Sequence, residues 1–321
     1  MPSQTTPQPT SNDCTDPIFI LGIMQRSGTN FLKDVVDLHP DCGFPGHPLV
    51  EDYLAQNADW LVKYVKSVAK DWNALGRGVD YSDLEEELIQ SLGDGAIAFL
   101  QSRIAQKRLL TKTPSVRNLK HFFKLFPNAR LIIVVRDGRA VVESGVKSFG
   151  WQYEDAFHQW ADAAARILEF DRLHKASNYK YLIVRYEEVW NNLEEEVTKI
   201  LQFLDLEKET YDFETALNLP VRGSSSARAN SDKLTWKGVE KPQDFNPLER
   251  WRTWDRERHD RFNWIAGYYM EAFGYELKQD KTNRSFSETR NRALDLRWQA
   301  RSVLKKNYRQ FKQAFIKELK E

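Results

Sequence analysis

The stretch FILGIMQRSGTNFL, residues 19–32, joins a predicted strand to a predicted helix. The turn between them contains Gly22 and Gly28, and such a turn directs free backbone N–H groups and the positive end of the helix dipole toward an anion. A nucleotide-binding P-loop would carry a lysine directly after its second glycine. Here Thr29 stands in that place, and Arg26 is the cation of the turn. The stretch therefore predicts a P-loop-like turn for an anion that needs no such lysine.

The alternation of apolar strands with helical patterns predicts the fold class. The runs expected as strands are residues 18–23, 108–112, 129–136 and 179–186. Helical spacing of apolar residues covers 29–38, 49–70, 82–106, 116–126, 137–148, 154–176 and 189–204. This order indicates an α/β fold with a parallel sheet flanked by helices, whose ligands bind at the carboxyl ends of the strands. Four polar residues stand at those ends and are expected around one crevice: Arg26, Lys112, Arg136 and Tyr186.

The composition is that of an ordinary globular chain of 321 residues with a net charge of +1. Residues 281–321 nevertheless carry twelve Lys and Arg against four Asp and Glu. We expect a disordered leader over 1–16, one α/β domain over 17–280 and a basic amphipathic helical tail over 281–321. Two cysteines, Cys14 and Cys42, make no disulfide framework, and no Cys/His cluster predicts a metal site. The sequence shows no signal-peptide or membrane-spanning pattern, which favours a cytoplasmic protein.

A second anion site is predicted at LIIVVRDGRAVVES, residues 131–144. Arg136 ends the apolar strand, and Ser144 follows eight residues later on the first turns of the next helix. Burial of Arg136 at the end of such a run would be costly without an anion. The two segments therefore predict two neighbouring anion sites on one sheet.

The two segments resemble the signatures of sulfotransferases that use 3′-phosphoadenosine-5′-phosphosulfate (PAPS). Their order and spacing are closest to the tyrosylprotein sulfotransferase branch and its bacterial relatives. The resemblance continues through IVRYEEV (183–189) and EKPQDFNPLERW (240–251), so it spans residues 17–270. It implies a sulfotransferase fold and transfer of the sulfuryl group from PAPS to a hydroxyl or amine acceptor, with 3′,5′-bisphosphoadenosine (PAP) as the product.

The resemblance also implies roles for individual residues. Those expected to hold the 5′-phosphosulfate are Arg26, Ser27, Gly28, Thr29 and Asn30. Those expected to bind the rest of the nucleotide are Arg136, Ser144 and Tyr186, with Arg228, Lys237 and Lys241 from a loop that closes over it. Ser226 is expected to help stabilise the transition state, and Lys112 the charge on the bridging oxygen as the sulfate leaves.

The catalytic base has two candidates. Counting from the turn, the position of the branch's catalytic glutamate falls on His47, and an imidazole titrates near neutral pH, as a general base should. Glu51 is the alternative, one helical turn further on if a helix begins near Pro48. In either case the base removes the acceptor proton during in-line transfer. Arg26 and Lys112 then hold the charge that develops on the leaving phosphate, without a metal.

The acceptor is left open among a small molecule, a lipid, a glycan and a peptide. Candidate walls of its pocket are Trp60, Tyr64, Trp72 and Tyr81. The tail over 285–320 carries an apolar stripe made of Leu294, Trp298, Leu304, Tyr308, Phe311, Phe315 and Leu319. We expect this stripe to dock on the body of the enzyme or on a second subunit, the alternative being an anionic membrane surface. No nucleic acid is expected, because no base-reading motif accompanies the charge.

Two other functions fit part of the pattern. A P-loop small-molecule kinase would share the strand, turn and helix, but it would need the missing lysine and an Asp that binds Mg²⁺ after a strand. A non-catalytic protein could bind an anionic nucleotide or a sulfated glycan through the basic tail. Intact transfer chemistry separates this last alternative from a sulfotransferase.

Overall fold

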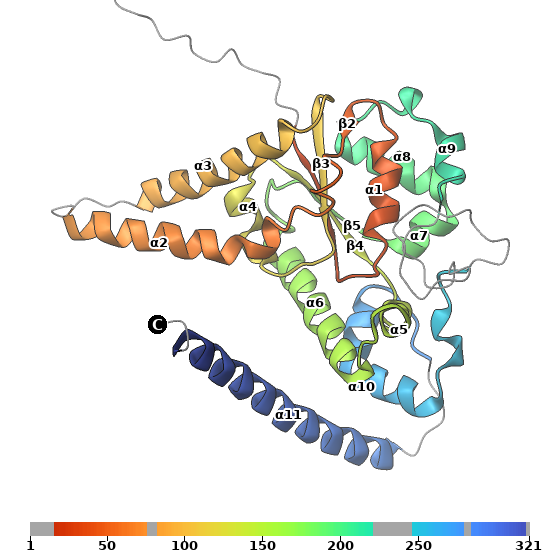
Figure 1. The fold of residues 1–321 in the computed structure, drawn as a ribbon. Coiled ribbons are helices and arrows are strands. Elements are labelled where there is room, and N and C mark those ends of the chain that lie inside the picture. Colours follow the sequence, from red (N-terminus) through yellow and green to blue (C-terminus); the bar gives the residue numbers. More distant parts are fainter. Residues whose placement is uncertain (1–15, 76–81, 221–245, 279–283, 319–321) are drawn as a thin grey trace, which may run out of the picture.

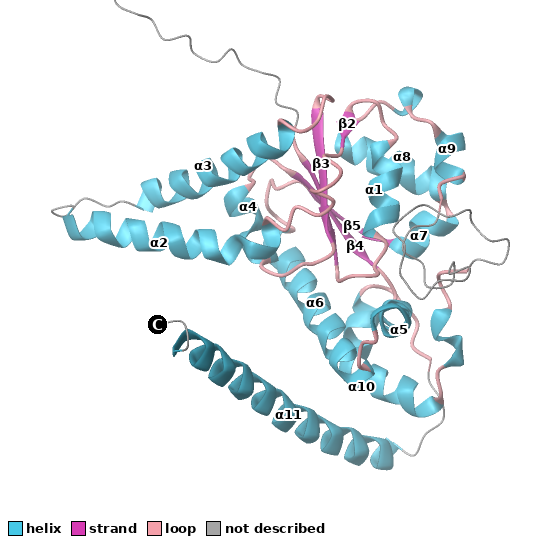
Figure 2. Ribbon diagram, viewed as in Figure 1, coloured by secondary structure: helices cyan, strands magenta, loops and turns pink. Residues whose placement is uncertain are grey.

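A computed structural model describes residues 16–75, 82–220, 246–278 and 284–318. Within them, five parallel strands form a sheet in the order β2-β3-β1-β4-β5, with helices on both faces (Figures 1 and 2). The strands are β1 (Ile18–Gly22), β2 (Cys42–Gly43), β3 (Arg108–Thr113), β4 (Arg130–Val135) and β5 (Tyr181–Arg185). The predicted α/β class with a parallel sheet is confirmed, and each of the four predicted strands lies within one or two residues of its expected place.

Side chains of the central strands alternate between two apolar layers. Phe19 and Leu21 of β1 belong to the core on one face. Ile18 and Ile20 belong to the core on the other face. Because β1 is buried on both faces, its sequence is a continuous apolar run rather than an alternating one.

The helices of the two layers have the following bounds. On the first face lie α2 (Ala58–Leu75), α3 (Ser82–Gln101), α4 (Phe122–Leu125), α5 (Gly138–Phe149), α6 (Tyr153–His174) and α10 (Arg256–Ala272). On the second lie α1 (Thr29–Asp37), α7 (Tyr186–Asn191), α8 (Leu193–Leu204) and α9 (Phe213–Leu217). Short 3₁₀ turns occupy Ala55–Asn57, Leu119–His121, Lys208–Thr210 and Arg250–Thr253.

The predicted helix over 49–70 begins nine residues later than expected. Residues 49–54 are a loop, because Asp52 and Tyr53 direct their backbone N–H groups to β3 instead of to a preceding turn. Tyr53 also has a positive φ of 55°, which an α-helix does not allow. The condition for placing Glu51 one helical turn beyond His47 is therefore not met.

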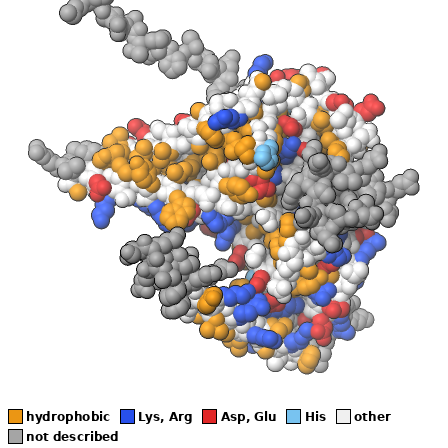
Figure 3. Space-filling model, in the orientation of Figure 1, with side chains coloured by type: hydrophobic (Ala, Val, Ile, Leu, Met, Phe, Trp, Pro, Cys, Tyr) orange, Lys and Arg blue, Asp and Glu red, His pale blue; other side chains and the backbone are white. Residues whose placement is uncertain are grey.

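Helices α2 and α3 project from the sheet as a hairpin (Figure 1), and hydrophobic side chains gather on the surface over them (Figure 3). Trp60 and Tyr64 on α2 and Phe99 on α3 are exposed. Trp60, Tyr64 and Trp72, which the sequence suggested as acceptor-pocket walls, do not line the cavity described below. Tyr81 lies outside the described residues.

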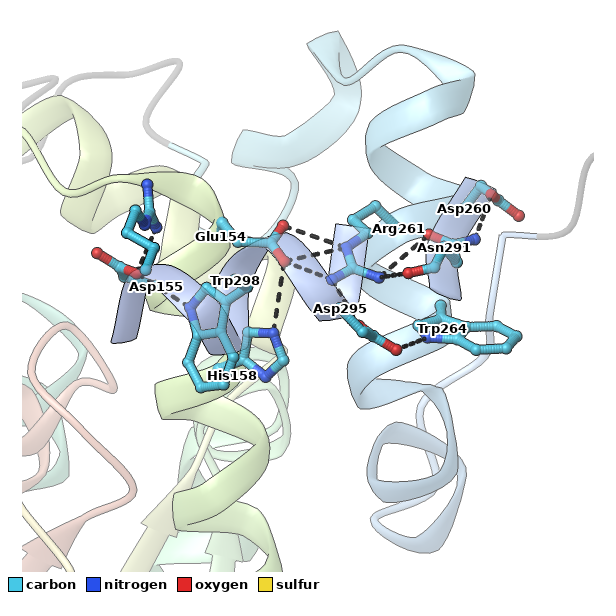
Figure 4. Close-up of polar contacts among 10 residues, drawn as sticks. Glu154, Asp155, His158, Asp260, Arg261, Trp264, Asn291, Asp295 and Trp298 are labelled. Carbon is cyan, nitrogen blue, oxygen red and sulfur yellow. Dashed lines mark hydrogen bonds and ion pairs between the residues drawn. The ribbon is translucent and has the colours of Figure 1, made fainter. Parts of the chain in front are cut away.

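The last described helix, α11 (Arg284–Glu318), contacts α6 through one carboxylate and one ring. Asp155 of α6 pairs with Arg301 at 2.7 Å and accepts a hydrogen bond from Trp298 Nε1 at 3.1 Å. The Trp298 ring stacks on His158, with 3.7 Å between the ring centroids (Figure 4). The contacts of α11 with α6 thus combine ionic pairing with ring stacking.

A second set of polar contacts joins α11 to α10. Arg261 of α10 is buried and pairs with Asp295 of α11 at 2.7 Å (Figure 4). Leu304 and Tyr308, two members of the expected apolar stripe, are exposed instead. No helix in the described parts of the chain combines the length and the apolarity needed to cross a membrane.

Candidate active site

The carboxyl ends of the three central strands lie side by side. Ile20 of β1 pairs with Lys112 of β3 and with Ile132 of β4, so the residues that follow these strands emerge at one edge of the sheet. A cavity of about 620 Å³ lies at this edge. Residues of the β1–α1 turn, of the loop at 50–53, of α5 and α7, and of the segment at 247–250 line it.

The β1–α1 turn approaches the cavity with its backbone. Arg26 and Gly28 have positive φ values of 75° and 97°, and Gly28 precedes the first residue of α1. A Cβ atom on Gly28 would lie 2.2 Å from the ring of Tyr186, so glycine is required both for the conformation and for the close packing. Ser27 is fully buried, and its Oγ has no hydrogen-bond partner within the described part of the chain. The turn therefore offers donors to a ligand.

Three arginines lie near Ser144, which stands in the second turn of α5. Arg26 Nε donates to Ser144 Oγ at 2.9 Å, and an Arg250 amino group donates to the same oxygen at 3.3 Å. Arg136 donates to the Arg26 carbonyl at 2.8 Å, and its guanidinium lies 4.4 Å from the centroid of the Tyr186 ring. Burial and the neighbouring charge of Arg136 lower the pKa of Arg250 to about 10.

This arrangement has the character of an anion site. Arg136 is buried, and its Nε has no hydrogen-bond partner among the residues that the structure describes. Like charges held together away from water repel each other and lose their hydration, so a bound anion would relieve both costs. The predicted neighbours Arg136, Ser144 and Tyr186 do lie together, next to the β1–α1 turn.

Arg250 is a site residue that the sequence reasoning missed. The segment that carries it is held to α5 by a 2.7 Å hydrogen bond from Trp254 Nε1 to Glu143, and by Arg139, whose guanidinium lies 3.9 Å from the centroid of the Trp251 ring. Arg250 lies within the stretch 240–251 that carried the family resemblance. A cation in that stretch was the available signal, but nothing in the sequence shows that it folds back onto Ser144.

At the other end of the cavity a lysine and a carboxylate form a pair. Lys112 Nζ lies 3.0 Å from Glu51 Oε1, and Lys112 is only 4% exposed. Burial lowers the pKa of Lys112, while the Glu51 carboxylate acts in the opposite direction. The hydroxyl of Tyr53 donates to the other oxygen of Glu51, and this bond raises the pKa of Tyr53 to about 12.

Three hydrogen bonds fix the position of Glu51 over β3. The backbone N–H of Asp52 donates to the Lys112 carbonyl at 3.3 Å, and that of Tyr53 donates to Thr113 Oγ1 at 3.0 Å. Thr111 Oγ1 donates to the Asp52 carboxylate at 2.8 Å. Because donors and acceptors lie on β3 and on the loop alike, Glu51 is held by the sheet rather than by a helix.

The other predicted site residues divide into three groups. Those that line the cavity are Arg26, Gly28, Thr29, Asn30, Glu51, Arg136, Ser144 and Tyr186. Ser27 and Lys112 are buried; Ser27 stands between Arg26 and Gly28 of that lining, and Lys112 pairs with Glu51. His47 is exposed and is not part of the lining, whereas Ser226, Arg228, Lys237 and Lys241 lie outside the described residues.

Residues 17–210 match the profile of the Sulfotransferase family, and the chain belongs to this family. It is similar to protein-tyrosine sulfotransferase A of Caenorhabditis elegans, with 26% identity over 253 residues, which cover 74% of this chain and 61% of the relative. It is also similar to the protein-tyrosine sulfotransferase of Drosophila melanogaster, with 28% identity over 203 residues, 59% of this chain and 38% of the relative. The matches thus span less than two thirds of the length of these relatives.

Solved structures show the same fold. The sulfotransferase domain of the olefin synthase from Synechococcus PCC 7002 aligns over 85% of this chain and 100% of that domain, with a TM-score of 0.52 and 23% identity. The predicted sulfotransferase fold is therefore confirmed.

The expectation of a cytoplasmic protein is wrong on this comparison. The matched relatives are protein-tyrosine sulfotransferases, which are Golgi membrane enzymes. The expectation rested on patterns missing from the sequence, and a missing pattern does not place a protein in a compartment.

Proposed function

We propose that this chain transfers the sulfuryl group of PAPS to a hydroxyl or amine acceptor and releases PAP. The observation that carries the proposal is that Arg26 and Arg250 both donate to Ser144, while Arg136 donates to the Arg26 carbonyl beside the β1–α1 turn. Membership of the Sulfotransferase family and the names of the curated relatives support the same reaction.

The residues present fit a doubly anionic nucleotide. The backbone N–H groups of residues 26–30 and the Arg26 side chain would hold the 5′-phosphosulfate. Arg136, Ser144 and Arg250 would hold the 3′-phosphate, since guanidinium groups suit phosphate oxygens. Ser27 Oγ and Arg136 Nε, both buried without partners in the described part of the chain, would gain acceptors from such a ligand. Aromatic rings of Phe31, Tyr186 and Trp190 form an apolar wall of the same cavity for the adenosine.

The chain's own groups would divide the chemistry between them. Glu51 would take the proton of the acceptor hydroxyl as the acceptor oxygen bonds to sulfur. The bond from sulfur to the bridging phosphate oxygen breaks in the same step, and that oxygen departs with the electron pair as part of PAP. Lys112 and Arg26 would stabilise the negative charge on the departing oxygen.

Glu51 is preferred to His47 as the base on geometric grounds. The Glu51 carboxylate lines the cavity and lies 3.0 Å from Lys112 Nζ, so the proton acceptor and the cation for the leaving group stand at one point. His47 is exposed on the preceding loop and has no place in the cavity lining. A base must come within hydrogen-bond reach of the proton it removes.

A peptide tyrosine is one acceptor to examine, because the curated relatives are named for it. The roles proposed above for Glu51, Lys112 and Arg26 do not depend on which acceptor carries the hydroxyl. The loop that closes over the nucleotide stays a prediction, with its residues Ser226, Arg228, Lys237 and Lys241.

The proposal is tested by calorimetric titration with PAP and, separately, with ATP and Mg²⁺. We expect PAP to bind and Arg136→Ala to weaken the binding by about 100-fold, while radiolabelled PAPS yields a labelled acceptor. Preference for ATP with Mg²⁺ would overturn the proposal in favour of a P-loop kinase. A third outcome is that PAP binds equally well to the wild type and to Lys112→Ala, and that neither transfers a sulfuryl group. This outcome would favour a non-catalytic nucleotide-binding protein.

A further inference from the structure

Helix α11 packs on the body of the protein through side chains that recur about once per turn. Ser287 and Asn291 donate to the Asp260 carboxylate of α10 at 2.6 and 2.9 Å. The next residues on this side, Asp295 and Trp298, make the contacts with α10 and α6 described above (Figure 4). Because these four residues of α11 follow one another at intervals of three or four, they define one side of the helix, its inner face.

The opposite side of α11, its outer face, is apolar and open to water. Ala293 and Ala300 on this side are exposed. Its large apolar side chains are between 57% and 69% exposed, and they are Phe286, Leu296, Val303, Leu304 and Tyr308. A helix on the surface of a protein usually turns its apolar stripe toward the core. In α11 the order is reversed, since the polar side packs on the body and the apolar side faces outward.

The outer face is long. From Phe286 to Tyr308 the helix rises by about 33 Å, at 1.5 Å per residue. Single exposed apolar residues are common on proteins, but a contiguous apolar surface of this length marks a place of interaction. Something other than the described body of the protein therefore covers the outer face.

Cations border the outer face. Arg292 and Arg297 are exposed, and neither forms an ion pair within the described parts of the chain. Arg292 stands four residues before Leu296 and Arg297 seven before Leu304, so both lie beside the apolar side chains along the helix. In sequence, α11 carries ten Lys and Arg against three Asp and Glu, and one of the three, Asp295, lies on the inner face.

We infer that the outer face of α11 binds the surface of an anionic phospholipid bilayer. An amphipathic helix of this kind places its apolar side chains at the boundary between headgroups and acyl chains, where bordering arginines meet lipid phosphates. A second copy of α11 would cover the same apolar surface, but it would bring like charges together. The inner face stays on α6 and α10, so α11 lies along the membrane surface without crossing it.

The test is cosedimentation of the full chain with lipid vesicles in the absence of nucleotide. The vesicles consist of phosphatidylcholine alone or of phosphatidylcholine with about 30% phosphatidylglycerol. We expect binding to the anionic vesicles to be at least about tenfold tighter than to the neutral ones, and to weaken as salt is added. Equal binding to both kinds of vesicle, or binding to neither, overturns the inference.

A pair of matched leucine variants locates the binding. Leu304→Ser should weaken binding to the anionic vesicles by about tenfold. Leu217→Ser should change it by less than about twofold, because Leu217 is 61% exposed but lies on α9, in the other helical layer. Thermal unfolding of each variant is the control for folding. An equal effect of both variants, or no effect of Leu304→Ser, overturns the assignment of the outer face.

A double variant examines the bordering cations. Arg292→Gln combined with Arg297→Gln should weaken binding to the anionic vesicles by about tenfold and leave binding to the neutral vesicles unchanged. An unchanged affinity for the anionic vesicles would overturn the choice of an anionic surface.

Sedimentation velocity without lipid examines the other occupant, a second copy of the chain. We expect the wild type and Leu304→Ser to sediment alike. Self-association of the wild type that Leu304→Ser abolishes would assign the outer face to a second copy and overturn the inference. None of these measurements uses PAPS or PAP, so their failure is distinguishable from failure of the proposed function.

Discussion

The two ends of the cavity differ in how directly the sequence encodes them. At the end proposed to bind the nucleotide, Arg26, Arg136 and Ser144 follow or flank strands that the sequence shows as apolar runs. The structure brings these three residues together, with Arg26 bonded to both of the others. At the proposed acceptor end, the sequence left the base open between His47 and Glu51, and the structure brings Glu51 to Lys112. The sheet fixes the position of a residue at the end of a buried strand. The position of a loop residue depends instead on hydrogen bonds that form only when the chain folds.

The largest expected effect is on kcat, and it shows whether Glu51 or His47 is the base. Glu51→Gln keeps the size of the side chain but removes the proton acceptor, and should lower kcat by about 10²- to 10⁴-fold. His47→Ala should leave kcat within about twofold, because surface substitutions away from a site have small effects. Both are measured from initial rates at saturating PAPS, with the affinity for PAP as the control for folding. The opposite ranking would return the role of base to His47.

The next effect concerns the arginine cluster. Arg136→Ala should weaken PAP by about 100-fold and Arg250→Ala by about tenfold, since a hydrogen bond to a charged group contributes about 1.5–3 kcal/mol. Arg252→Ala is the matched control, because Arg252 pairs with Glu249 at the surface, two residues from Arg250. Calorimetry with PAP checks all three variants. If Arg252→Ala loses as much affinity for PAP as Arg250→Ala, the arginines act only through general positive charge and not through direct contact.

A pair of glycine variants compares the backbone of the β1–α1 turn with that of the loop before His47. Gly28→Ala places a Cβ atom against Tyr186 at a φ of 97° and should cost more than the 1–2 kcal/mol or so of a left-handed residue, with loss of PAP binding. Gly46→Ala has a φ of 72° but open space around its Cβ, so only the conformational cost should appear. Urea unfolding gives the free energies, and PAP titration gives the affinities. Equal costs would mean that the contact with Tyr186 is not tight.

The smallest effect is the pH dependence of the acceptor end. A lowered pKa means that Lys112 loses its proton at a lower pH than a free lysine, whose value is 10.5. The rate should therefore fall as the pH rises through this lowered value, by about tenfold per pH unit above it. Lys112→Arg, which stays protonated, should move the alkaline limb of the kcat profile to higher pH. An unchanged limb in this variant would assign the titration to another group.

Much of the fold was predictable because apolar runs report burial directly. The stretches at 18–23 and 129–136 became β1 and β4, and the parallel order of the sheet followed from the helices between them. The start of α2 was not predictable in this way. Apolar spacing continues through residues 49–57, but the backbone there bonds to β3, and only the folded sheet offers those partners.

The sequence alone predicts the strands, the turn between β1 and α1, and the placing of Arg136 and Ser144 beside that turn, because local periodicity and strand ends carry that information. The tertiary structure alone decided that Glu51, and not His47, stands against Lys112, and that Arg250 returns to Ser144 from more than a hundred residues away. Both contacts join segments through side chains on loops and short turns. Their positions depend on the packing of Trp254 on α5 and on the hydrogen bonds of Asp52 to β3, which no local pattern records.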